Sequence, residues 1–299
     1  MTDTPQFDPT APLKATGNLR RRQIVSRIAE LGATGAAVIA LAVLTIVIIA
    51  VISHGASVLS WHFLTTSPPQ FGGNSGGIAP AIVGTALIVA AATAIAMPVG
   101  VLMAIYLTEF AGPRGGRPIR LMLDVMNGLP SIVIAIFIFG LLVVGHHQSG
   151  FAASVALAII MLPLIARSSQ EVLLLVPDAQ REAADALGVA RWRSITGVIL
   201  PAALGGILTG TVLAVARAAG ETAPVLLLSS IAPPGEVGTN IFGGPVSNIP
   251  MYIFNASEQA DPSGFARAWG ASFVLLMFIL ISSLGARALL ARSRSKVSR

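Results

Sequence analysis

The sequence lacks cysteine altogether and carries few charged side chains. Without cysteine there is no disulfide, no thiolate nucleophile and no thiolate metal ligand. Charged residues make up 11% of the 299 residues, whereas soluble globular proteins carry about 25%. The scarcity of charge argues against a soluble enzyme, and we predict no catalytic residue and no metal site in this chain. The histidines are too few and too scattered for a metal cluster: His54, His62, His146 and His147.

Apolar residues are abundant instead, at 54% of the chain, with a mean hydropathy of +0.81. This fraction excludes intrinsic disorder, and without a Gly-X-Y repeat the chain is not a collagen. No Asp, Glu, Lys or Arg occurs in residues 31–108 or in residues 125–166. Because about 20 apolar residues cross a bilayer, the sequence predicts an all-α membrane protein. We predict six transmembrane helices, over residues 31–53, 78–108, 119–145, 150–166, 203–230 and 268–290.

Lysine and arginine gather at the ends of these apolar segments, which is a topology signal rather than a nucleic-acid-binding surface. Of the 19 Lys and Arg residues, 17 fall on the side that holds both termini. The exceptions are Arg217, within the fifth span, and Arg267, in an outer loop. The positive-inside rule therefore predicts that both termini are cytoplasmic. The predicted domains are a cytoplasmic N-terminal tail (1–28), a transmembrane domain (29–290) and a basic cytoplasmic tail (291–299).

The longest polar stretch after the N-terminal tail, residues 167–202, separates the fourth and fifth spans. Pro177 and Asp178 can begin a helix there, with the acid near the positive end of the helix dipole. Gly188 can end that helix in a left-handed cap. Periodicity alone leaves two interpretations open: a helix folded onto its own chain or the membrane surface, or a helix that docks on a partner. Its narrow apolar face would comprise Ala183, Ala184 and Leu187.

The same loop contains Glu182-Ala183-Ala184, then Gly188 six positions after the Glu, and then Leu200-Pro201. This spacing resembles the EAA loop of ATP-binding-cassette (ABC) importer permeases. The resemblance implies a coupling helix that docks in a groove of an ATPase subunit and transmits closure of the ATPase dimer. Neither lysine, Lys14 or Lys296, follows a glycine, so the chain has no P-loop. The resemblance implies that the partner ATPase binds ATP and Mg²⁺, and that this chain holds no cofactor of its own. The matching residues are Glu182, Ala183, Ala184, Gly188, Leu200 and Pro201, with Val198 where the family usually has Ile.

Two charges interrupt the fifth predicted span: Arg217 near its midpoint and Glu221 one helical turn further. A charge at mid-membrane costs about 2.5–3.5 kcal/mol on insertion scales, so such residues usually pair and face a protein interior or a water-filled path. Gly220 and Pro224 weaken the helix at this point and are candidate hinge residues. The pair is either an anion gate, in which the Arg217 guanidinium meets an oxyanion, or a structural ion pair.

Residues 216–224 (Ala-Arg-Ala-Ala-Gly-Glu-Thr-Ala-Pro) resemble the signature of PstA-type permeases of phosphate importers. The resemblance implies the type I ABC importer permease fold in a bacterial cytoplasmic (inner) membrane. It also implies that phosphate passes near Arg217 and Glu221, to which we add the adjacent Thr222. Further segments of the same kind extend the resemblance over about residues 76–289: residues 76–85, 97–100, 104–111 and 128–133.

The family resemblance also implies partners. These are a second permease of the PstC type, an ATPase dimer of the PstB type and an external phosphate-binding protein of the PstS type, within membrane lipid and without nucleic acid. The physics of the residues leaves the oxyanion open, because sulfate and molybdate also present oxygen atoms to arginine. An ion-driven secondary transporter is a further alternative, although no inverted repeat is apparent. An intramembrane enzyme would need a catalytic set that the spans lack.

Three smaller features carry structural expectations. Asp124, near the cytoplasmic end of the third span, is expected to pair with Arg120 one turn earlier; the alternative is a contact to the loop that follows the fourth span. Pro130 is expected to kink the third span. Gly206 and Gly210 form a Gly-x-x-x-Gly step, which is typical of close contact between membrane helices.

Overall fold

The computed structural model describes residues 18–69, 76–112, 114–231, 238–258 and 261–297. The chain divides into two units, residues 1–50 and 51–299, which we describe separately. The first unit contains most of helix α1 (Asn18–Gly55). This helix begins at Asn18, so part of the predicted polar tail, including Arg20 and Arg27, is helical. The remainder of that tail, residues 1–17, lies outside the described residues.

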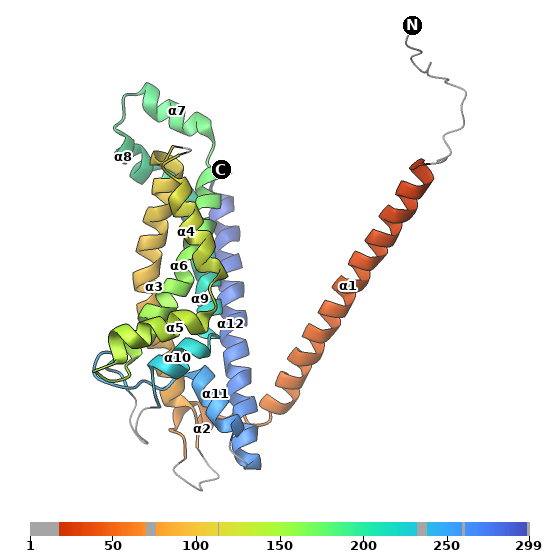
Figure 1. The fold of residues 1–299 in the computed structure, drawn as a ribbon, viewed down its shortest axis with the longest axis vertical. Coiled ribbons are helices and arrows are strands. Elements are labelled where there is room, and N and C mark those ends of the chain that lie inside the picture. The colour runs from red at the N-terminus through yellow and green to blue at the C-terminus, as the bar shows by residue number, and fades with distance from the viewer. Residues whose placement is uncertain (1–17, 70–75, 113, 232–237, 259–260, 298–299) are drawn as a thin grey trace. The chain divides into compact units, whose positions relative to one another are not determined.

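Within the described residues, five helical segments are long and apolar enough to cross a membrane. A sixth is added if a bent pair of helices counts as one span, which matches the predicted number. Four of the five belong to the second unit and run along one another in Figure 1. They are α3 (Ala79–Ile105) with η1 (Tyr106–Phe110), α6 (Gly150–Leu174), α8 (Arg191–Ser194) with η3 (Ile195–Ile199) and α9 (Leu200–Ala219), and α12 (Pro262–Val297).

The third span is not the single helix predicted over residues 119–145. It is split into α4 (Arg117–Gly128) and a second piece, α5 (Ser131–Ile138) with η2 (Phe139–Val143), and the two pieces meet at 99°. Pro130 is the cause, because a proline pushes the preceding residue out of the helical region. Leu129 is accordingly extended, with ψ 132°. The predicted kink is therefore a complete break, and α5 turns away from the direction of α4 (Figure 1).

The fourth and fifth spans also differ from their predicted limits. Helix α6 continues to Leu174 rather than ending near residue 166. Arg167, the first charged residue beyond the predicted end, pairs with Asp124 of α4. The fifth span begins at Arg191 and ends at Ala219, and the predicted continuation to residue 230 is wrong. A separate short helix, α10 (Ala223–Leu228), follows the break. The loop predicted over residues 167–202 shrinks to the segment that contains α7 (Asp178–Ala186).

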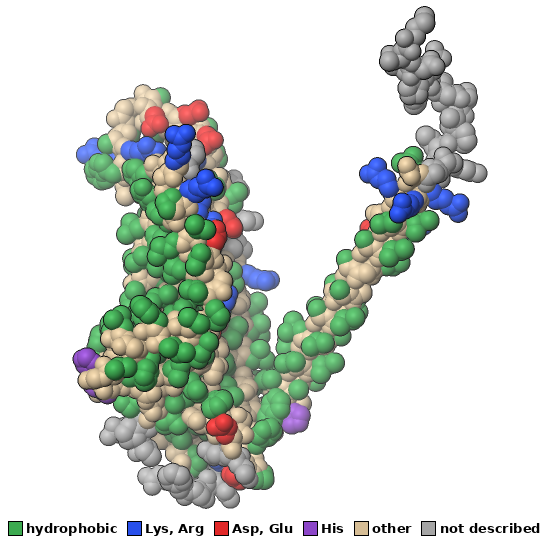
Figure 2. All heavy atoms as spheres, in the orientation of Figure 1, with side chains coloured by type: hydrophobic (Ala, Val, Ile, Leu, Met, Phe, Trp, Pro, Cys, Tyr) green, Lys and Arg blue, Asp and Glu red, His purple; other side chains and the backbone are tan. Residues whose placement is uncertain are grey.

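The two ends of the second unit carry different short elements (Figure 1). Helices α7 and α8 lie at one end, and α2 (Trp61–Thr65) and α11 (Ile249–Glu258) lie at the other. Figure 2 shows Lys, Arg, Asp and Glu side chains gathered at the α7 end, whereas the face between the ends is mostly apolar. This distribution is the one expected for a bundle whose middle lies in lipid.

Helix α12 begins earlier than predicted because Asp261 caps it and Pro262 occupies its first position. The Asp261 carboxylate accepts hydrogen bonds from the backbone N–H groups of Ser263 (3.2 Å) and Gly264 (3.1 Å) and from the Ser263 hydroxyl. These bonds, the Ser263 hydroxyl first, hold the pKa of Asp261 below its ordinary value. A depressed pKa means that the cap stabilises the fold above the ordinary pKa and is lost as pH falls through the lowered one.

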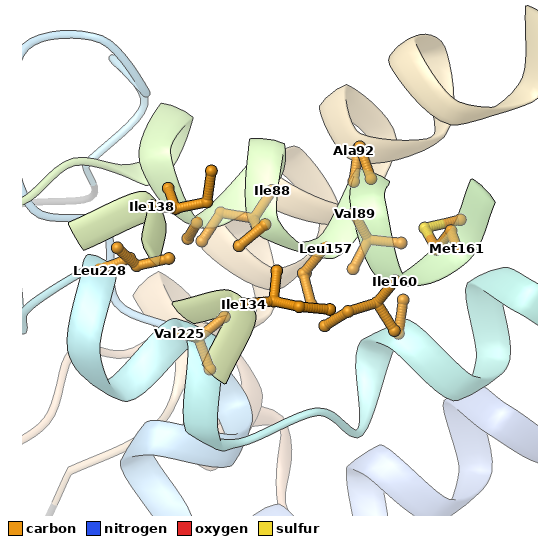
Figure 3. Close-up of a cluster of buried hydrophobic side chains, with 14 of the residues drawn as sticks. Ile88, Val89, Ala92, Ile134, Ile138, Leu157, Ile160, Met161, Val225 and Leu228 are labelled. Atoms are coloured by element: carbon orange, nitrogen blue, oxygen red, sulfur yellow. The ribbon is translucent and has the colours of Figure 1, made fainter. Parts of the chain in front are cut away.

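The main core cluster joins α3, α5, α6, α9 and α10, and Figure 3 shows part of it. Lipid chains are as apolar as these side chains, so helix association in a membrane depends on close van der Waals packing and favours small residues. The cluster is accordingly rich in buried alanine, such as Ala92 of α3 and Ala156 of α6. Its larger members include Ile88, Val89, Ile134, Ile138, Leu157, Ile160, Met161, Val225 and Leu228.

The Gly-x-x-x-Gly step is a close helix contact, as predicted. A Cβ atom on Gly206 would lie 2.6 Å from Cγ2 of Val172, and one on Gly210 would lie 2.6 Å from Cβ of Ser168. Both neighbours belong to α6. The absence of side chains at these two positions of α9 therefore lets α6 and α9 approach closely.

We expect Gly210→Ala to lower the free energy of unfolding by about 1–3 kcal/mol, because the added methyl group forces α6 and α9 apart. Gly197 of η3 is a matched control, because nothing lies within 4 Å of a Cβ atom there. Gly197→Ala should leave stability unchanged or raise it by up to about 1 kcal/mol, since alanine favours a helix. Thermal unfolding of the purified chain in detergent measures both. Equal effects of the two substitutions would show that close packing is not the reason for Gly210.

Candidate functional site

The fifth span ends where its two charged residues lie. Helix α9 stops at Ala219, and Gly220 caps it with its N–H bonded to the carbonyl oxygen of Arg217 at 3.1 Å. The sequence predicted that Pro224 would be a hinge within one continuous helix. It lies instead in the first turn of a separate helix, α10. The reason is that a proline has no N–H to bond back to the preceding turn, so it suits a helix start. The candidate hinge residues therefore bracket a break between two helices.

Arg217 and Glu221 face each other across this break rather than within one helix. Arg217 Nε lies 3.7 Å from Glu221 Oε1, which is a loose ion pair. The Arg217 side chain is 56% exposed and that of Glu221 is 20% exposed. Thr222 is exposed as well and caps α10 without a side-chain hydrogen bond. The break thus presents a guanidinium and a hydroxyl on a surface of the chain, with a carboxylate partly behind them.

Leu213, one turn before Arg217, is 54% exposed. Since residues four apart share a face of a helix, Leu213 and Arg217 mark one uncovered side of α9. The opposite side, which includes Ala214 and Ala218, is buried in the core cluster. The guanidinium therefore stands on an apolar helix face that the other described residues of the second unit leave uncovered.

A small cavity of about 10 Å³ lies behind the break and is lined in part by Glu221. It holds about one water molecule, so a tetrahedral oxyanion enters only if the lining helices separate. Polar groups from other elements also reach it. The Thr85 hydroxyl accepts a hydrogen bond from the Ile249 N–H at 2.9 Å, and the Asn248 side-chain oxygen accepts one from the Met251 N–H at 2.9 Å. The full lining is Thr85, Ile88, Val89, Leu157, Ala218, Ala219, Glu221, Val225, Asn248 and Pro250.

The predicted cytoplasmic helix is present as α7, and its predicted left-handed cap is confirmed at Gly188, which has φ +69°. The predicted apolar stripe is only partly correct. Ala184 is buried, but Ala183 is exposed and Leu187 is 81% exposed. Glu182 is exposed too. The helix therefore turns Ala184 and, in part, Arg181 inward and presents its other residues outward.

Two large apolar side chains next to α7 are also uncovered. Leu175, before the helix, is 79% exposed, and Trp192, after it, is 61% exposed. Leu200 and Pro201, the last members of the predicted coupling set, are not in the loop but begin α9. Leu200 packs on a buried cluster with Leu173, Val176 and Ile199. The structure thus separates this set into an exposed helix and the base of the span that follows.

The sequence analysis missed the contacts that hold α7 to the bundle. Arg181 of α7 bonds Glu109 of η1, 72 residues earlier, with Nη2 3.1 Å from Glu109 Oε1. Arg191 donates to the backbone oxygen of Glu109 and lies over the Phe110 ring at 5.1 Å. A signal existed, because Glu109 follows a charge-free run of residues and no Lys or Arg lies three or four residues from it, where a helix would bring a partner. Its partner could not be identified without the fold.

Asp124 does not use the partner that its spacing predicts. Its carboxylate pairs with Arg167 of α6 and not with Arg120. Arg120 contributes its backbone oxygen instead, which accepts a hydrogen bond from Arg167 Nη2 at 3.3 Å. Arg167 belongs to a helix rather than to the loop, so this pair ties α4 to α6.

Comparison with known proteins identifies the family. The family model described as "Binding-protein-dependent transport system inner membrane component" matches residues 96–295. "Phosphate transport system permease protein PstA 1" of Mycobacterium tuberculosis is 38% identical over 221 residues, covering 73% of this chain and 71% of that protein. PstA of Yersinia pestis is 36% identical over 231 residues, covering 77% of each chain.

Solved structures support the fold. A chain of a bacterial alginate ABC transporter, solved in complex with an alginate-bound periplasmic protein, aligns over 90% of this chain and 97% of its own, with a TM-score of 0.61 at 16% identity. A chain of the MetNI methionine ABC transporter aligns over 71% of this chain and 94% of its own, with a TM-score of 0.54 at 18% identity. The architecture is therefore that of a type I ABC importer permease.

The chain is thus a multi-pass membrane component of a binding-protein-dependent ABC transport system. Within that class it belongs to the PstA permease family of phosphate transport systems.

Proposed function

We propose that this chain forms half of the translocation path of an ATP-driven phosphate importer and is not itself catalytic. The observation that carries the proposal is the placement of Arg217, a guanidinium on an uncovered apolar face of α9 beside a break in the span. A planar guanidinium suits an oxyanion because its N–H groups form paired bonds to two oxygen atoms. The identity to PstA relatives favours phosphate among the oxyanions.

The face that carries Leu213 and Arg217 would be covered by the second permease, of the PstC type, so that the path lies between the two subunits. Thr222 would add a hydroxyl to the path, and Glu221 would hold the guanidinium when no anion is present. Separation of α9 and α10 at Gly220 and Pro224 would widen the cavity behind Glu221. This is an alternating-access mechanism, in which Arg217 exchanges its contact with Glu221 for a contact with the phosphate.

Coupling to ATP would pass through α7. Its exposed surface, which includes Glu182, Ala183 and Leu187, would dock on an ATPase dimer of the PstB type that binds ATP and Mg²⁺. Both termini would then be cytoplasmic, in a bacterial inner membrane, and a phosphate-binding protein of the PstS type would dock at the α2 and α11 end. Exposed Leu175 and Trp192 favour partner docking over a helix that is merely folded back on its own chain.

The test is uptake of radiolabelled phosphate by cells that lack this chain and are supplied with it again. Energy-dependent uptake that excess sulfate and molybdate leave unchanged is the expected result, and ATP depletion is the control. Uptake that sulfate or molybdate blocks would keep the ABC mechanism but change the substrate. Failure to restore any uptake, with the whole complex present in the membrane, would contradict the proposal.

A further inference from the structure

Arg181 makes several of the contacts that attach α7 to the rest of its unit. Arg181 donates hydrogen bonds to Glu109 Oε1 (3.1 Å), to the backbone oxygen of Leu173 (2.9 Å) and to that of Val176 (2.6 Å), and it pairs with Asp178 at 3.1 Å. Leu173 and Val176 lie at and just beyond the end of α6, whereas Asp178 belongs to α7 itself. The bonds to Leu173 and Val176 hold α7 to the end of α6, the span that precedes it in the chain, whereas the Glu109 bond joins α7 to the span that ends in η1.

The Glu109 side chain is buried. It is 6% exposed, and the side chain of Arg181 is 22% exposed. Removing one partner of such a pair leaves an uncompensated charge in a site with little water. Glu109 lies in η1, a π-helical turn that extends α3, and π-turns occur frequently at functional sites. Arg191 holds the same turn through the Glu109 backbone oxygen, so α7 is bracketed by two arginines that bind one residue.

Span two connects this residue with the candidate path. Helix α3 and η1 form one apolar segment, Ala79–Phe110. Its other half carries Thr85, Ile88 and Val89, which line the cavity beside Glu221. Glu109 lies 24 positions after Thr85 (109 − 85), which corresponds to about 36 Å of helix at 1.5 Å per residue. A displacement of Glu109 is therefore delivered to the wall of the cavity by a helix rather than by a loop.

We propose that the Arg181–Glu109 ion pair makes span two the lever through which α7 opens the anion path. Arg181 and Glu109 are positioning residues, because neither touches the path. The pair stays closed during the cycle, and α7 and η1 move together when the ATPase subunits close. This inference rests on the proposed function, in which α7 is the docking helix.

The experiment uses the complete complex in proteoliposomes, with the partner permease, ATPase and phosphate-binding protein, and records phosphate uptake and ATP hydrolysis together. We expect Glu109→Gln to retain ATP hydrolysis while phosphate transported per ATP falls by about tenfold. Asp124→Asn is the matched control, because it removes the carboxylate of another ion pair between helices, the pair that joins α4 to α6 and does not involve α7. That variant should change the ratio by less than about twofold.

A wild-type ratio in Glu109→Gln would overturn the lever, and so would an equal fall in Asp124→Asn. If the Glu109→Gln variant does not assemble, Arg181→Lys is tested in its place. This substitution keeps the positive charge but replaces the planar guanidinium, which makes several hydrogen bonds, with a single ammonium group. The same fall in transport per ATP is then expected, and an unchanged ratio would overturn the inference. The proposed function fails in a different way, because the wild-type complex would then carry no phosphate at all.

Discussion

Phosphate uptake is expected to fall by at least about 30-fold when Arg217 is replaced with Gln, which corresponds to the loss of about 2 kcal/mol at a charge pair. Glutamine keeps some length and hydrogen-bonding capacity but removes the positive charge. Glu221 is then left without its partner, and its carboxylate repels an anion at the break between α9 and α10. Radiolabelled phosphate uptake in cells that lack the native chain measures the effect.

Two controls separate a gate from a structural pair. Arg287→Gln removes a positive charge from an exposed position on α12, beyond its apolar segment, and should leave uptake unchanged. Co-purification of the partner subunits shows whether Arg217→Gln still assembles in the membrane. A variant that assembles and transports at the wild-type rate would refute the gate. A variant that fails to insert or assemble would show that Arg217 and Glu221 form a structural pair.

The structural features predicted correctly from the sequence are those that depend on residues close together in the chain. Runs without charge predict where helices can cross a membrane, because an unpaired charge in lipid is costly whatever the fold. The beginning of α7 near Asp178 and its cap at Gly188 depend on residues within one turn, and both were predicted correctly. The contact at Gly206 and Gly210 was predictable for a similar reason, since only small residues permit so close an approach.

The errors arise where an apolar run contains a helix end. Residues 119–145 and 203–230 are apolar enough for unbroken helices, yet the chain breaks at Leu129 and again after Ala219. Proline and glycine mark both places. Whether such a residue kinks, breaks or starts a helix depends on which neighbours satisfy the freed backbone groups. The partners of Arg181 and Asp124 were missed because both lie on other spans, dozens of residues away.

Replacing Gly188 with Val is expected to uncouple the importer. At φ +69° a β-branched side chain is an outlier, so the chain must leave the left-handed region and change the direction in which it leaves α7. Nothing lies within 4 Å of a Cβ atom at Gly188, so the effect comes from the backbone alone. ATPase subunits should detach in detergent, or hydrolyse ATP while phosphate transport falls by about tenfold or more.

The chain supplies its own control for this substitution. Gly145 is the other described residue with positive φ, at +81°, and it also has nothing within 4 Å of a Cβ atom. It lies between η2 and α6, away from α7. Gly145→Val imposes the same kind of backbone strain, about 1–2 kcal/mol, so it should lower stability without changing transport per ATP. Gly188→Asn should remain coupled, because asparagine tolerates the left-handed region. Equal uncoupling by Gly145→Val and Gly188→Val would assign the effect to general destabilisation, whereas coupling by Asn but not by Val ties it to the direction of the chain at the end of α7.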